Sequence, residues 1–173
     1  QTSFLMVGTV EPRKGHWQTL KAFEQLWAQG HNAHLVIVGK EGWLIDEFAT
    51  ELNQHPELNR RLYWFTDISD EYLVALYDAC AGLIAASYCE GFGLPLIEAA
   101  KHKLPIIARD LPVFREVAQQ HAFYFDSQTP EQLALALVEW MSLYDLDKHP
   151  KSLNMPWLTW QASAQRLLDT LIT

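Results

Sequence analysis

The sequence is poor in cysteine and has no long apolar run. Its 173 residues contain only two cysteines, Cys80 and Cys89, and they form no CxxC pair. This usage indicates two buried or half-buried thiols in a reducing compartment and excludes a disulfide-stapled secreted domain. No apolar segment approaches the roughly 18 residues that a membrane span needs, and no charged-then-apolar leader opens the sequence. We therefore expect a cytoplasmic protein.

Basic residues and metal-binding motifs are also scarce. Lys and Arg total 13 against 21 Asp and Glu, which gives a formal net charge of −8. This charge argues against a general nucleic-acid binder, because phosphate backbones are bound by dense Lys and Arg surfaces. No HExxH motif is present. Asp145 and Asp147 form a DxD pattern, but we expect it to end a helix, so we predict no metal site.

Apolar segments and helical patterns alternate along the chain. With 49% hydrophobic residues, a chain of this length can bury about 70% of its unfolded surface as one domain. Strands are predicted over residues 4–10, 34–39, 62–65, 82–87, 105–110 and 122–125. Helices are predicted over residues 20–27, 43–52, 69–80, 95–103, 113–117, 130–146 and 160–171. This order predicts an α/β, Rossmann-like, doubly wound parallel sheet of about six strands.

Four loops follow the first four predicted strands. They are GTVEPRKGH (8–16), GKEGW (39–43), TDISD (66–70) and SYCEGFGLP (87–95). In a parallel sheet, ligands bind beyond the carboxyl ends of the strands. All four loops are expected to face one rim, and we place the site there.

The fourth loop combines glycine, proline and carboxylates. Gly91 and Gly93 allow backbone conformations that other residues avoid, and Pro95 suits a first helical turn. The free N–H groups of the following helix favour a phosphate. Glu90 and Glu98 suit sugar or ribose hydroxyls better than phosphate. The alternative is that the glycines only turn the chain and that Glu98 complements the helix dipole.

The first loop supplies cations through Arg13 and Lys14. In a doubly wound sheet the first and fourth strands are neighbours, so Lys14 could reach a phosphate at the fourth loop. The alternative is a solvated basic pair before a turn. Taken together, a cation, a glycine loop, a helix N-terminus and two hydroxyl acceptors fit a nucleotide linked to a sugar.

These segments resemble the C-terminal, donor-binding domain of the retaining GT-B glycosyltransferases of family four. GTVEPRKGH resembles the first-strand motif, and EGFGLPLIE, with the Glu90 to Glu98 spacing, resembles the family's pair of glutamates. LPVFREV and WLTWQASAQRLL are similar to later segments. The resemblance spans roughly residues 4–172. It implies that 1–173 is the nucleotide-sugar domain, with 157–173 as its terminal helix and the N-terminal acceptor domain absent from this chain.

The resemblance also implies residue roles. The residue matching Lys14 binds the donor diphosphate, Glu90 contacts the transferred sugar and Glu98 holds the ribose hydroxyls. Many members carry Arg where this chain has Thr9, and Arg13 is the candidate to replace it. The expected catalytic residues are Lys14, Arg13 and Glu90. The expected substrate-binding residues are Gly8, Thr9, Gly39, Lys40, Ile68, Gly91, Phe92, Gly93, Leu94 and Glu98.

The implied reaction is the transfer of a sugar from a nucleoside diphosphate sugar with retention of configuration and without a metal. EPRKGH with GKEGW looks most like mannosyltransferases of bacterial surface polysaccharides, which implies GDP-mannose as donor. The acceptor would be a polysaccharide or a lipid-linked glycan at the cytosolic membrane face. The isolated domain is expected to be inactive. The alternatives are a non-catalytic nucleotide-binding module and a sugar-nucleotide epimerase-like domain.

Overall fold

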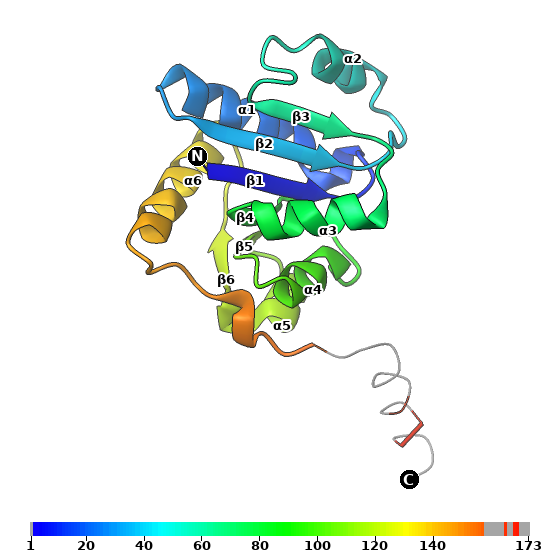
Figure 1. Cartoon of the computed structure of the whole chain (residues 1–173), viewed down its shortest axis with the longest axis vertical. Helices are drawn as coiled ribbons and strands as arrows, with labels where there is room; N and C mark the ends of the chain where they lie inside the picture. The colour runs from blue at the N-terminus through cyan, green and yellow to red at the C-terminus, as the bar shows by residue number, and fades with distance from the viewer. Residues whose placement is uncertain (1, 158–164, 166–167, 170–173) are drawn as a thin grey trace.

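A six-stranded parallel sheet forms the centre of the protein. The computed structural model describes residues 2–157, 165 and 168–169. The strand order is β3-β2-β1-β4-β5-β6 (Figure 1), so the predicted doubly wound fold is confirmed. The strands are β1 (Thr2–Val7), β2 (Ala33–Val38), β3 (Leu62–Phe65), β4 (Gly82–Ala85), β5 (Ile106–Arg109) and β6 (Ala122–Phe125).

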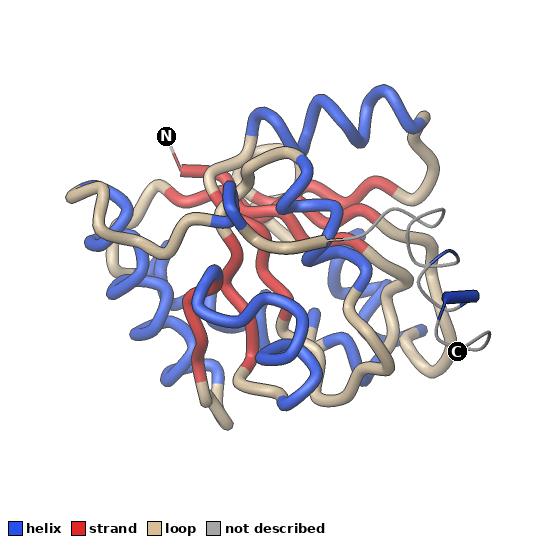
Figure 2. The backbone as a smooth tube through the Cα atoms, turned by 90° about the horizontal axis from the view of Figure 1, so that it is seen from below, coloured by secondary structure: helices blue, strands red, loops and turns tan. Residues whose placement is uncertain are grey.

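Helices cover both faces of the sheet (Figure 2). One face carries α1 (His16–Ala28), α2 (Asp46–Gln54) and α6 (Pro130–Asp145). The other carries α3 (Asp70–Ala79), α4 (Leu94–Lys101) and α5 (Pro112–Ala118). Three short 3₁₀ turns are η1 (Pro12–Lys14), η2 (Gln119–His121) and η3 (Ser152–Asn154). None of the helices formed by the described residues is long and apolar enough to cross a bilayer.

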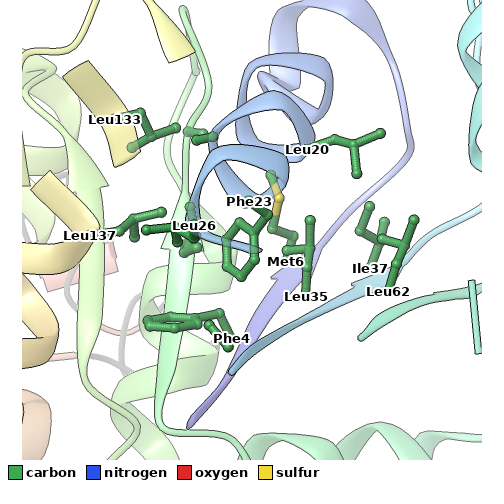
Figure 3. Packing of buried hydrophobic residues seen from close by; sticks show 14 of the residues in the cluster. Phe4, Met6, Leu20, Phe23, Leu26, Leu35, Ile37, Leu62, Leu133 and Leu137 are labelled. Carbon is green, nitrogen blue, oxygen red and sulfur yellow. The ribbon is translucent and has the colours of Figure 1, made fainter. Parts of the chain in front are cut away.

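The sheet is buried on both faces because its strands are largely apolar. On the α1 face, Phe4 contacts Phe23 and Trp140 edge-on, with ring centroids 5.6 and 5.2 Å apart. Figure 3 shows this layer, where side chains of β1 and β2 meet those of α1 and α6. Trp27 and Trp140 are 8% and 0% exposed, which confirms that they are core residues.

Several predicted boundaries were wrong. The first strand ends at Val7 instead of residue 10, because Gly8 has a φ of 134° and turns the chain. The second helix begins at Asp46 instead of Trp43, because Leu44 has a left-handed backbone with a φ of 54°. Only Gly and a few polar residues adopt that conformation readily. Both errors lie in loops that flank the rim.

The helix ends agree with the sequence in two places. Ser69 accepts a hydrogen bond from the Tyr72 N–H and caps α3. Asp145 ends α6, as expected for the DxD pattern. The predicted terminal helix falls almost wholly outside the described residues. Cys80 is half-buried, but Cys89 is exposed, so the expectation of two buried or half-buried thiols was wrong for Cys89.

Candidate active site

At the rim of the sheet, the segments that follow β1 and β4 turn to opposite faces of the sheet. The two strands pair in parallel, with Phe4 opposite Gly82 and Leu5 opposite Leu83. Beyond them, the chain continues into α1 on one face and into α4 on the other. Such a switch point leaves a crevice between the two loops, and ligands of doubly wound sheets bind there.

Gly15 sets the loop after β1 directly against the end of β4. Its φ is 74°, and a Cβ atom at this position would lie 2.3 Å from the carbonyl oxygen of Ala86. The Tyr88 N–H donates to the carbonyl of Arg13 at 2.8 Å and ties the two loops together. Only glycine permits this close approach. The contact brings the basic pair of the first loop to the fourth loop, as the sequence predicts.

Glu90 is the centre of a charged cluster. Lys14 Nζ lies 2.5 Å from Glu90 Oε1, and Arg13 lies 3.2 Å from Oε2. The hydroxyl of Ser87 donates to Oε1 at 2.7 Å. Burial alone would raise the pKa of Glu90, but hydrogen bonds from Lys14 and Ser87 and the two positive charges outweigh it, so this pKa lies below its ordinary value. Glu90 is therefore ionised at neutral pH.

The amino end of α4 lies beside this cluster. Gly93 is the N-cap residue, with a φ of 93°, and no side chain caps the helix. Pro95 lies in the first turn, as predicted. Pro95 has no N–H and the Leu96 N–H donates to the Gly93 carbonyl at 3.0 Å, which leaves the N–H groups of Gly93 and Leu94 to bind an anion. Gly93 thus has the conformation that the sequence predicts, but Gly91 has no positive φ, so that part of the prediction was wrong.

Lys14, Glu90 and Gly93 line one small cavity. Its volume is about 20 Å³, enough for about one water molecule. His16 also lines it, and its Nδ1 has no hydrogen-bond partner. Burial, helped by the charge of Lys14, lowers the pKa of His16 to about 4, so the ring is neutral at pH 7. The predicted convergence of the first and fourth loops is therefore confirmed.

The loops after β1 and β2 also meet at the rim. A Cβ atom on Gly39 would lie 1.9 Å from the carbonyl oxygen of Gly8, and the Val10 N–H donates to the carbonyl of Lys40 at 2.9 Å. Thr9 is exposed. The rim is thus continuous from β2 to β4. None of the predicted residues Gly8, Thr9, Gly39 and Lys40 lines the small cavity.

Phe92, Leu94, Ile68 and Glu98 do not line the cavity either. Phe92 and Leu94 are 52% and 46% exposed. Ile68 is partly buried against the core on the α3 face. Glu98 lies in the second turn of α4, where Oε2 accepts a hydrogen bond from Tyr77 at 2.8 Å. Their binding roles stay predictions.

Sequence reasoning missed the buried residue that supports the fourth loop. Arg109 ends β5 and is 5% exposed. It donates to the carbonyls of Ala86 and Ser127 at 3.1 and 2.6 Å and also to Gln18. Its guanidinium lies over the ring of Tyr88, 4.3 Å from the centroid. The one signal in the sequence is a charged residue at the end of an apolar strand, which indicates a paired or functional group.

Replacing Arg109 with methionine should lower the free energy of unfolding by about 3 kcal/mol, because three acceptors each lose a hydrogen bond from the buried guanidinium. Denaturation in urea measures this loss. Arg115→Met is the control, because Arg115 is exposed and pairs with Asp110 at the surface. We expect a much smaller loss for this variant. Equal losses for the two variants would contradict the supporting role of Arg109.

Within the described residues, no group of three or more His, Cys, Asp and Glu side chains is arranged to hold a metal ion. The groups that meet at the rim are instead the cations Arg13 and Lys14, the carboxylate of Glu90 and a helix N-terminus without a side-chain cap. These groups suit an anion joined to a polyhydroxyl compound.

The fold and the site define a doubly wound α/β domain with a crevice between the loops that follow β1 and β4, the place where ligands of such sheets bind. Residues 1–153 match the family described as "Glycosyl transferases group 1". The chain belongs to this family, which confirms the resemblance.

Curated relatives and a solved structure agree with this assignment. The serotype-specific mannosyltransferase WbdA of Escherichia coli is 56% identical over 169 residues, which are 98% of this chain and 21% of WbdA. The O-antigen chain mannosyltransferase RfbU of Salmonella typhimurium strain LT2 is 30% identical, over 79% of this chain and 38% of RfbU. The C-terminal domain of a group 1 glycosyl transferase from Francisella tularensis has the same fold, with a TM-score of 0.73 and 22% identity, over 88% of this chain and 81% of that one. The chain thus spans about a fifth of WbdA.

Proposed function

We propose that this chain is the donor-binding domain of a retaining glycosyltransferase that transfers mannose from GDP-mannose to a hydroxyl group of a polysaccharide or lipid-linked acceptor. The observation that carries the proposal is the convergence of Lys14, Glu90 and the free N-terminus of α4 on one cavity. The family supports glycosyl transfer, and the relatives named as mannosyltransferases support the choice of mannose.

Catalysis in this proposal rests on the leaving group. When the bond between the anomeric carbon and the phosphate oxygen breaks, the sugar ring gains positive charge and GDP gains negative charge. Groups that stabilise this negative charge lower the barrier. Lys14 and the N–H groups at the start of α4 have this role. The leaving phosphate accepts the proton of the acceptor hydroxyl, and the hydroxyl oxygen forms the new glycosidic bond.

Glu90 orients the sugar and does not attack it. Its two oxygens already accept from Lys14, Arg13 and Ser87, which ties its negative charge to two cations. A carboxylate held in this way is a weak nucleophile but a good acceptor for sugar hydroxyls. The cavity, of about 20 Å³, is smaller than a diphosphate. In this proposal, Lys14 turns from Glu90 to the diphosphate when the donor binds.

Arg13 provides the second cation of the proposed site. It pairs with Glu11 at 2.6 Å and with Glu90 at 3.2 Å, and its side chain is 40% exposed. Because it is exposed, it can turn toward a bound diphosphate in place of the arginine that Thr9 replaces. The proposal needs no metal ion. It places the reaction at the cytosolic face of the membrane, where the acceptor domain supplies the other half of the site.

Calorimetric titration of the chain with GDP, UDP and ADP tests the proposal. We expect GDP to bind more tightly than UDP and ADP. A preference for UDP or ADP would contradict GDP-mannose as the donor, and a purely structural module would bind none of the three. The chain alone should transfer no mannose, because the acceptor domain is needed. Mannose transfer by the chain alone would contradict the need for an acceptor domain.

A further inference from the structure

Tyr77 of α3 holds the carboxylate of Glu98 in one orientation. Its hydroxyl donates to Glu98 Oε2 at 2.8 Å and joins α3 to α4 across 21 residues of sequence. No described residue donates to the second oxygen, Oε1, which remains an acceptor. A glutamate side chain has three rotatable bonds, so a fixed hydrogen bond to one oxygen decides where the other points.

Tyr77 is itself held firmly. It is 3% exposed, and its ring stacks on His102 of the segment after α4, with centroids 5.1 Å apart and planes 12° from parallel. His102 Nδ1 lies 2.8 Å from Asp78 Oδ1, so this ring is fixed as well. Burial and the charge of Glu98 raise the pKa of Tyr77, so the hydroxyl keeps its proton and acts as a donor throughout the physiological pH range.

A hydrogen bond that fixes the orientation of a carboxylate can strengthen ligand binding. A carboxylate that must meet ribose hydroxyls is more effective when its orientation is set before the ligand arrives, because less side-chain entropy is lost on binding. Glu98 is half-buried on α4, the helix whose amino end faces the cavity. Its orientation is therefore set by Tyr77, which is buried and does not line the cavity.

We infer that Tyr77 is a positioning residue that orients Glu98 toward the ribose hydroxyls of the donor nucleotide. The inference rests on the proposed function and adds a specificity determinant to it. Tyr77→Phe removes only the hydroxyl and keeps the stacked ring. The variant is expected to lose discrimination between GDP and 2′,3′-dideoxy-GDP, which lacks both ribose hydroxyls.

The test is calorimetric titration of the wild-type chain and Tyr77→Phe with the two nucleotides. In the variant, GDP affinity should fall on the order of fivefold, while dideoxy-GDP affinity should change less than twofold. The ratio of the two affinities is measured on the same folded protein, so a loss of stability does not change it. A hydrogen bond that merely tethers α3 to α4 would leave this ratio at its wild-type value, and that result would overturn the inference.

Two further variants make the test specific. Tyr124→Phe removes a tyrosine hydroxyl that donates to the carbonyls of Phe114 and Gln119, away from Glu98, and should leave the ratio unchanged. In a chain that already carries Glu98→Ala, Tyr77→Phe should have no further effect on the ratio. A further drop there would show that Tyr77 acts by another route and would overturn the inference.

The wild-type titration separates this inference from the proposed function. If the chain binds no GDP, the proposed function fails and the inference fails with it. If GDP binds but dideoxy-GDP binds equally well, Glu98 does not meet the ribose, and only the role assigned to Glu98 and Tyr77 is overturned.

Discussion

Replacing Lys14 with methionine is expected to reduce mannose transfer by the full-length enzyme about a hundredfold, or about 3 kcal/mol in the activation barrier. Methionine keeps the unbranched apolar stem of lysine but lacks the ammonium group that would face the leaving diphosphate. In the isolated chain, the same change should weaken GDP binding at least tenfold, because a hydrogen bond to a charged group contributes about 1.5 to 3 kcal/mol.

Two variants test the reason for this loss. Lys21→Met removes a lysine that pairs with Glu24 and Glu51 away from the rim, and GDP binding should not change. Glu90→Gln removes the carboxylate that competes with the diphosphate for Lys14, so GDP should bind as tightly as in the wild type or more tightly. Unchanged GDP binding in Lys14→Met would refute the assigned role of Lys14.

The second large effect is expected at Gly15. Gly15→Ala should lower the free energy of unfolding by about 3 to 5 kcal/mol, because it combines an unfavourable positive φ with a clash against the Ala86 carbonyl. The clash is with backbone, which cannot rotate away as a side chain can. The loop that carries Lys14 should then separate from β4, so GDP binding should fall as well.

The variants Gly30→Ala and Gly39→Ala separate the cost of a positive φ from the cost of a clash with a backbone carbonyl. Gly30 has a φ of 88° and open space around it, so Gly30→Ala should cost only about 1 kcal/mol. A Cβ atom on Gly39 would lie 1.9 Å from the Gly8 carbonyl oxygen, but its φ is not in the left-handed region, so Gly39→Ala should show the cost of a backbone clash alone and exceed that of Gly30→Ala. Urea denaturation of the three variants measures the order. Similar losses for Gly15→Ala and Gly30→Ala would contradict the close packing of the first and fourth loops.

The sheet could be predicted because its strands are buried on both faces. Such strands appear as uninterrupted apolar runs, and the helices between them fix the parallel order. The boundaries at Gly8 and Leu44 could not be predicted, because they depend on backbone angles in loops that pack on each other. A left-handed leucine has no local signal in the sequence.

The candidate site was predicted only in part. The motif residues Lys14, Glu90 and Gly93 could be placed because neighbouring strands bring their loops together. Tyr77 and Arg109 could not be assigned, because each acts through a contact with a residue far along the chain. Tyr77 follows an ordinary helical pattern, and only the fold shows that its hydroxyl reaches Glu98.

The central claim is that Lys14 and the amino end of α4 hold one diphosphate between them. A crystal structure of the chain with GDP tests this most directly. We predict that Lys14 Nζ has left Glu90 and that both Lys14 and the first N–H groups of α4 lie within hydrogen-bond distance of phosphate oxygens. A nucleotide bound elsewhere, with the Lys14 and Glu90 pair intact, would contradict the account.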